Sequence, residues 1–161
     1  MTTTPRIQSP KTTQHLELIR AMVRGEVEHP PVAKLVGFEI KAIDVGRSVF
    51  ELEAGPRHAN PMGTLHGGIL CDLADAACGV AMASTLEDDE SFTTLDLTAK
   101  FLKPIWNTRL RATAVMVKRT RTLGLLECEV IDAGESLVAR VYSTCMVLRG
   151  DEAKGRSIAS S

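Results

Sequence analysis

Residues 60–83, read as NPMGTLHGGILCDLADAACGVAMA, constrain the fold more than any other part of the chain. After a polar, glycine-bearing loop, the segment lacks proline and consists mostly of small and apolar residues. This pattern predicts a helix of roughly 27 Å. A helix that is apolar on nearly every side belongs in the interior, and this one is too short and too acidic to span a membrane. The chain is therefore expected to wrap around a buried helix that carries Asp72 and Asp75 in its first turns.

The composition is that of one ordinary globular domain. A length of 161 residues is enough for one core, and a formal net charge of −1 gives no sign of a nucleic-acid or membrane surface. The four cysteines stand in apolar stretches without the paired spacing of a zinc site, which favours buried reduced thiols and no metal. No secretory signal pattern is visible, so we expect a cytoplasmic location.

Sequence patterns on both sides of the central helix predict the remaining elements. An amphipathic helix is expected over 12–25, with Thr13 as its N-cap, and a short helical turn over 32–36 ends at Gly37. Alternation of apolar and polar residues predicts strands at 38–45, 48–54, 92–102, 109–119, 123–132 and 136–148. In the third of these strands, alternation places Thr94 and Asp96 on one face and Leu95 on the other. The acidic connector 86–91 is interpreted as a solvated loop.

This order of elements predicts an α+β fold, in which a curved antiparallel β-sheet wraps around one long central helix and an extra helix precedes it. The expected divisions are a disordered tail over 1–11, an N-terminal helical segment over 12–36, the main domain over 37–149 and a C-terminal tail over 150–161. One sheet cannot cover both sides of an apolar helix. We therefore expect a second subunit to cover the rest.

The start of the central helix carries backbone amides that can stabilise negative charge. Gly67 and Gly68 let the backbone approach a ligand closely, and their amides stand at a helix N-terminus. Such amides can polarise a carbonyl and hold an oxyanion. Asp75 lies about two turns further on, where packing alone gives no reason for a carboxylate. Either it does chemistry, or hydroxyl and backbone donors satisfy it as a buried acid.

The motif N-P-M-G-T-L-H-G-G-I-L-C-D-L-A-D-A-A, over residues 60–77, resembles a known signature. It is similar to that of hotdog-fold acyl-CoA thioesterases of the phenylacetate-pathway type, the PaaI-like branch of the 4-hydroxybenzoyl-CoA thioesterase superfamily. The strand L-D-L-T-A-K-F-L-K-P-I, over 95–105, resembles the strand that follows in that family. The resemblance extends over about 37–148 and implies a hotdog fold for the main domain. The helix over 12–25 lies outside it.

The resemblance implies a role for five residues. Asp75 matches the catalytic carboxylate, which in relatives either attacks the thioester or activates water. Asn60 matches a residue that positions the water or the substrate, and His66 one that supports the loop or the thioester. Gly68 matches the glycine whose amide contacts the thioester oxygen. Thr94 falls where some relatives carry a Ser or Thr that orients the water from the facing subunit.

Each of these residues also has a structural alternative. Asn60 is suited to an Asx turn that shapes the loop, and His66 to a hydrogen bond with a backbone carbonyl. Thr94 is a good strand former. Lys118, Arg119 and Arg121 gather near one hairpin, where residues of this fold often meet the phosphates of coenzyme A. A solvated basic turn is an equally good interpretation of these three.

The resulting prediction is hydrolysis of an acyl-CoA thioester by a homodimer that assembles into a homotetramer. It needs no cofactor, since coenzyme A is part of the substrate, and it implies no nucleic-acid or membrane partner. One alternative is a hotdog hydratase or dehydratase, a group that pairs an active His with an acid. Another is a non-catalytic acyl-CoA sensor. Known sensors of this kind carry a DNA-binding module in front, for which the segment before Gly37 is too short, and the chain as a whole is not basic.

Overall fold

The structure, a computed structural model, describes residues 12–156. Its helices are α1 (Gln14–Val23), α2 (Pro31–Val36) and α3 (Gly67–Ala83), with 3-10 turns at Pro56–His58 and Gly150–Ala153. Its strands are β1 (Phe38–Asp44), β2 (Arg47–Ala54), β3 (Ser91–Phe101), β4 (Thr108–Arg119), β5 (Leu123–Asp132) and β6 (Leu137–Leu148). The tail expected over 1–11 and the end of the C-terminal tail, 157–161, lie outside the described residues.

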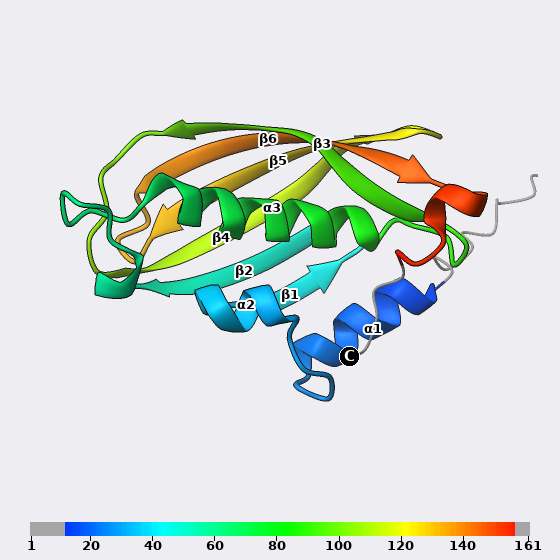
Figure 1. Cartoon of the computed structure of the whole chain (residues 1–161), viewed down its shortest axis with the longest axis horizontal. Helices are drawn as coiled ribbons and strands as arrows, with labels where there is room; N and C mark the ends of the chain where they lie inside the picture. Colours follow the sequence, from blue (N-terminus) through cyan, green and yellow to red (C-terminus); the bar gives the residue numbers. More distant parts are fainter. Residues whose placement is uncertain (1–11, 157–161) are drawn as a thin grey trace, which may run out of the picture.

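The strands form one six-stranded antiparallel sheet in the order β1-β2-β4-β5-β6-β3. Figure 1 shows the sheet curving behind α3, with α1 and α2 beside the β1 end. This arrangement confirms the predicted α+β fold with a central helix and an extra N-terminal helix. β1 and β3 are the two free edges of the sheet, because each has a neighbour on one side only.

One face of α3 packs against the concave side of the sheet. Its fully covered positions recur every three or four residues, as expected for a helix with one buried side: Leu70, Leu73, Ala74, Ala77, Cys78, Ala81 and Met82. Small buried residues of the sheet, such as Ala112, Ala114 and Cys128, meet this face and let the helix approach closely. The opposite face carries Asp72 and Asp75, which are exposed. The single sheet thus leaves one side of the helix open, as expected from the sequence, and its cover by a second subunit stays a prediction.

A bulge in β3 changes which way Thr94 points. In the β3–β6 ladder Thr94 pairs with Cys145 and Asp96 with Thr144, so Leu95 has no partner. Directly paired residues point to the same side of a sheet, and Cys145 is buried beneath α3. Thr94 therefore lies on the concave face, although Asp96 does not. The simple alternation expected for this strand was wrong at Thr94, since a bulge is not visible in the sequence pattern.

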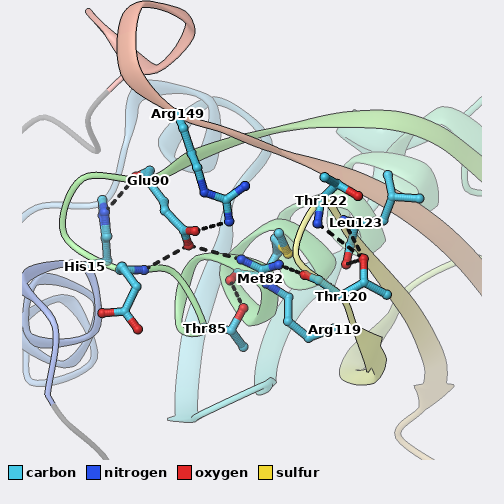
Figure 2. Close-up of polar contacts among 10 residues, drawn as sticks. His15, Met82, Thr85, Glu90, Arg119, Thr120, Thr122, Leu123 and Arg149 are labelled. Carbon is cyan, nitrogen blue, oxygen red and sulfur yellow. Dashed lines mark hydrogen bonds and ion pairs between the residues drawn. The ribbon is translucent and has the colours of Figure 1, made fainter.

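Glu90 is buried, although the sequence suggested that the whole connector 86–91 is a solvated loop. Its side chain is only 7% exposed and forms ion pairs with Arg149 and, at 3.1 Å, with Arg119. Its backbone carbonyl accepts a hydrogen bond from His15 Nε2 of α1 at 3.1 Å. Figure 2 shows these groups converging on Glu90 from α1, the end of β4 and the end of β6. We call these four residues, Glu90, His15, Arg119 and Arg149, the Glu90 cluster.

The Glu90 cluster gives a stability prediction. Glu90→Ala leaves the Arg119 guanidinium without its carboxylate in a largely buried place, so we expect the free energy of unfolding to fall by about 2–3 kcal/mol. Asp89→Ala is the matched control, because Asp89 is an exposed acid in the same connector. Urea titrations followed by circular dichroism measure both. Equal midpoints for the two variants would show that the buried ion pairs contribute no net stability.

Candidate active site

The carboxylate of Asp75 meets the hydroxyl of Thr94 where α3 passes β3. Thr94 Oγ1 donates a hydrogen bond to Asp75 Oδ1 at 3.1 Å, within a single chain. The helix brings Asp75 to its uncovered face, and the bulge after Thr94 turns the hydroxyl toward it. One carboxylate oxygen is thus held by Thr94, and Asp75 lines the cavity described below. The structure brings these two predicted site residues together within one chain, and the role expected for Thr94 toward a facing subunit stays a prediction.

The surroundings of Asp75 raise the pKa of its carboxyl group above the ordinary value. Desolvation by the neighbouring apolar surfaces is the largest cause; the hydrogen bond from Thr94 lowers the pKa, and the charge of Asp72 raises it again. Asp75 is nonetheless exposed in the single chain, so water reaches the carboxylate while apolar groups flank it. A carboxylate with a raised pKa is a better proton acceptor.

Removing the Thr94 hydroxyl tests this balance. Thr94→Val keeps the side-chain shape but deletes the hydrogen bond that lowers the pKa of Asp75, so this pKa should rise further. Activity that needs ionised Asp75 disappears as the pH falls through its pKa. The acid limb of the kcat/KM profile should therefore move to higher pH. Thr93→Val is the control at the neighbouring position, and an acid limb that stays in place in Thr94→Val would contradict this role.

His66 and the two glycines after it form the start of α3. His66 is the N-cap, and its Nδ1 accepts a hydrogen bond from the Gly68 N–H at 2.9 Å. A ring nitrogen that accepts carries no proton, so neutral His66 presents an Nε2–H donor on an exposed side chain. The Gly67 N–H has no partner among residues 12–156. Of the two amides that the sequence offered, Gly67 is thus the available one, although the sequence reasoning had assigned the role to Gly68.

The loop before α3 is held in place by its own hydrogen bonds. Asn60 Nδ2 donates to Thr64 Oγ1 at 2.8 Å, and Asn60 Oδ1 accepts from the Met62 N–H at 2.9 Å. This is the Asx-type geometry given as the structural alternative for Asn60, and a direct role in catalysis stays a prediction. His58, which the sequence reasoning missed, is buried and accepts the His66 N–H on its carbonyl at 2.9 Å. The loop thereby fixes the position of His66.

The cysteines are free thiols, as expected, and two of them lie near the candidate site. Cys145 Sγ lies 4.0 Å from Thr94 Oγ1, and burial raises the pKa of the Cys145 thiol. Burial also raises the pKa of Cys71 on α3, with the charges of Asp72 and Asp75 adding to the effect. A thiol with a raised pKa is a poor nucleophile. The carboxylate of Asp75 is therefore the better reactive group.

The basic residues near the β4–β5 hairpin do not form one free patch. Lys118 and Arg121 are exposed, whereas Arg119 belongs to the Glu90 cluster. Binding of coenzyme A phosphates by any of the three stays a prediction, and the ion pair leaves Arg119 the weakest candidate. In residues 12–156 we find neither a group of side chains suited to hold a metal ion nor a helix long and apolar enough to cross a bilayer.

A cavity of about 660 Å³ opens beside the Asp75–Thr94 pair. The exposed face of α3 forms one wall of it, through Ala76, Gly79 and Val80. Side chains from α1, the linker after it, α2 and β1 form the opposite wall. One chain thus supplies an oriented carboxylate beside a large, mostly apolar cavity and, about 12 Å further back along α3, a free helix-start amide. Groups of both kinds serve acyl transfer to water.

A six-stranded antiparallel sheet wrapped around one long helix is the architecture of the hotdog fold. Comparisons with known proteins agree. The family profile described as "Thioesterase superfamily" matches residues 62–139. The chain is 29% identical to 1,4-dihydroxy-2-naphthoyl-CoA hydrolase of Listeria monocytogenes. The alignment extends over 112 residues, which are 70% of this chain and 89% of the relative.

Two solved structures extend the comparison. A phenylacetic acid degradation-related protein of Ralstonia eutropha JMP134 is 34% identical with a TM-score of 0.73, over 80% of this chain and 98% of that one. The PaaI protein of the E. coli phenylacetic acid degradation operon has a TM-score of 0.74 at 24% identity, over 83% and 96%, and supports the fold alone. The chain belongs to the thioesterase superfamily, and its class of activity is thioester hydrolysis.

Proposed function

We propose that this protein hydrolyses an acyl-CoA thioester to the free acid and coenzyme A, with Asp75 as general base or nucleophile. The observation that carries the proposal is the Asp75–Thr94 pair in the lining of the large apolar cavity. A thioester placed there would have its carbonyl carbon beside the carboxylate and its acyl group against apolar walls. The relative from Listeria, whose name gives an acyl-CoA substrate, supports the same choice of substrate class.

The proposed site needs two copies of the chain. An oxyanion donor must come within about 3 Å of the carbonyl oxygen that Asp75 prepares for attack. Gly67 and Asp75 lie on one helix, separated by about 12 Å along its axis, so they cannot serve the same carbonyl. A second copy with its α3 antiparallel would place its Gly67 N–H opposite Asp75. A homodimer of this kind would also cover the part of the exposed α3 face that the cavity leaves free.

The steps of hydrolysis follow from these groups. Ionised Asp75, oriented by Thr94, takes a proton from water as the water oxygen bonds to the thioester carbon, or it bonds to that carbon directly. The carbonyl oxygen becomes an oxyanion, which the Gly67 N–H of the second copy stabilises, assisted by the helix dipole. The carbon–sulfur bond then breaks, and the coenzyme A thiolate takes up a proton. In the direct route, water afterwards hydrolyses the anhydride with Asp75.

The test is a product assay with purified protein and a panel of acyl-CoAs that includes alkanoyl, phenylacetyl and 4-hydroxybenzoyl thioesters. Hydrolysis predicts free thiol and free acid in equal amounts. Thiol-free conversion with a change in unsaturation would instead indicate a hydratase or dehydratase. Binding without any product would indicate a sensor. Either result would overturn the proposed function.

A further inference from the structure

The N-terminal segment over residues 14–36 precedes the part of the chain that resembles the family, yet it borders the candidate site. Met22 of α1, Val27 of the linker and Pro31 of α2 line the same cavity as Asp75 and Thr94. The cavity thus lies between the exposed face of α3 and a wall supplied by this segment. Without that wall, the apolar face of α3 from Ala76 to Val80 would be open on this side.

The segment is fastened to the domain at both ends. At the start of α1, Asp88 Oδ1 accepts the Gln14 N–H at 2.7 Å, and His15 bonds to the Glu90 carbonyl. Ile19 of α1 and Ala33 of α2 are buried in the core. The acidic connector after α3 therefore holds α1 in place. A wall that is anchored in this way has a fixed position relative to Asp75.

The lining of the cavity as a whole, including the part that the sheet supplies, is suited to a hydrocarbon. Three of the four phenylalanines of the chain, Phe38, Phe50 and Phe92, line it. Its charged residues at the linker are exposed and paired, Glu26 with Arg24 and Glu28 with Lys34. Among the polar side chains that line it within residues 12–156, only His29 lacks a hydrogen-bond partner. Along the phenylalanines and the α3 face, a polar acyl group would thus lose water without gaining a hydrogen-bond partner.

We propose that residues 14–36 form the acyl-binding wall of the active site and select substrates with an unsubstituted hydrocarbon acyl group, alkyl or phenylalkyl. This assignment rests on the proposed function, which supplies the reacting carbonyl at Asp75. The acyl group extends from that carbonyl between α3 and the linker. Val27 is the position at which this wall is tested, because it lines the cavity from an irregular linker, where side-chain size can change without disturbing a helix or strand.

The experiment compares kcat/KM for acetyl- to dodecanoyl-CoA, phenylacetyl-CoA and an ω-carboxyalkanoyl-CoA. In the wild type, kcat/KM should rise by about fourfold for each added methylene until the cavity is filled. Val27→Trp should lower kcat/KM for decanoyl-CoA at least about tenfold while butyryl-CoA stays near wild type. Leu35→Trp is the matched control, since Leu35 on α2 is 79% exposed and does not line the cavity.

Binding to Asp75→Asn, measured by calorimetry with and without Val27→Trp, decides the assignment independently of turnover. The wall predicts a selective loss of decanoyl-CoA affinity in the double variant. Equal effects on butyryl- and decanoyl-CoA, no effect on either, or a preference for the ω-carboxy chain would overturn it. If the wild type releases no thiol from any acyl-CoA but the selective loss of affinity remains, the proposed function fails and the binding wall stands.

Discussion

Asp75→Asn is expected to lower kcat for thioester hydrolysis by about 10²–10⁴-fold, the usual range for a lost general acid or base. The amide keeps the size of the carboxylate and can still contact Thr94, but it neither accepts a proton from water nor attacks the thioester carbon. Because the loss concerns the chemical step, kcat should fall while substrate affinity changes little. Thiol release under saturating acyl-CoA measures the effect.

The same variant should gain stability. The folded state raises the pKa of Asp75, so folding binds its proton more tightly than the unfolded chain does. Stability from this group is therefore present at low pH and is lost as the pH rises from the unfolded pKa through the folded one. At neutral pH the ionised carboxylate destabilises the fold, and Asp75→Asn should raise Tm.

Asp72→Asn is the matched control, since Asp72 is an exposed acid one turn earlier on α3. It should keep turnover near the wild-type value. An active Asp75→Asn variant would remove Asp75 from the mechanism. An inactive variant with a lowered Tm would point to a structural role for the carboxylate.

Gly67→Pro is expected to reduce kcat by about 10²–10³-fold, the range seen when one oxyanion donor is lost. Gly67 is the first residue of α3, where proline is well tolerated, and His66 already has the extended backbone (φ −66°, ψ 131°) that a following proline requires. The substitution therefore removes the N–H while the helix is kept. This N–H has no partner within residues 12–156, so no internal hydrogen bond is lost.

Gly67→Ala separates the loss of the N–H from the added carbon. A Cβ at position 67 would lie 3.1 Å from the Phe101 ring, but Phe101 is 53% exposed and can turn away. The alanine variant keeps the N–H and should retain most of its activity. Similar losses in the alanine and proline variants would assign the effect to crowding against Phe101 and would contradict an oxyanion role for Gly67.

Local patterns in the sequence predicted most of the fold. The bounds of β5, the N-cap at Thr13 and the end of α2 at Gly37 all agree with the structure, because alternation, capping and left-handed glycines are properties of short stretches. The motif around His66 and Asp75 also placed both residues on or beside α3. The bulge at Leu95 was missed, since it depends on the register between β3 and β6.

The details of the site depend on tertiary contacts, which the sequence pattern does not show. Glu90 looks like its acidic neighbours in sequence, but β4 and β6 bring two arginines to it. The motif does not distinguish Gly67 from Gly68. In the structure, the His66 ring accepts the Gly68 N–H, which leaves only the Gly67 N–H of the two available. Val27 lies far from Asp75 in the chain, and only the packing of α1 and the linker places both beside one cavity.

In the proposed mechanism, Asp75 of one chain and Gly67 of another act on the same thioester. The most direct test of this arrangement is to unfold, mix and refold equal amounts of Asp75→Asn and Gly67→Pro protein and to measure thiol release. Each variant alone is expected to be nearly inactive. Random pairing makes half of the dimers mixed, each with one intact site, so the mixture should recover about one quarter of wild-type turnover. A refolded mixture no more active than its components would contradict a site shared between two chains.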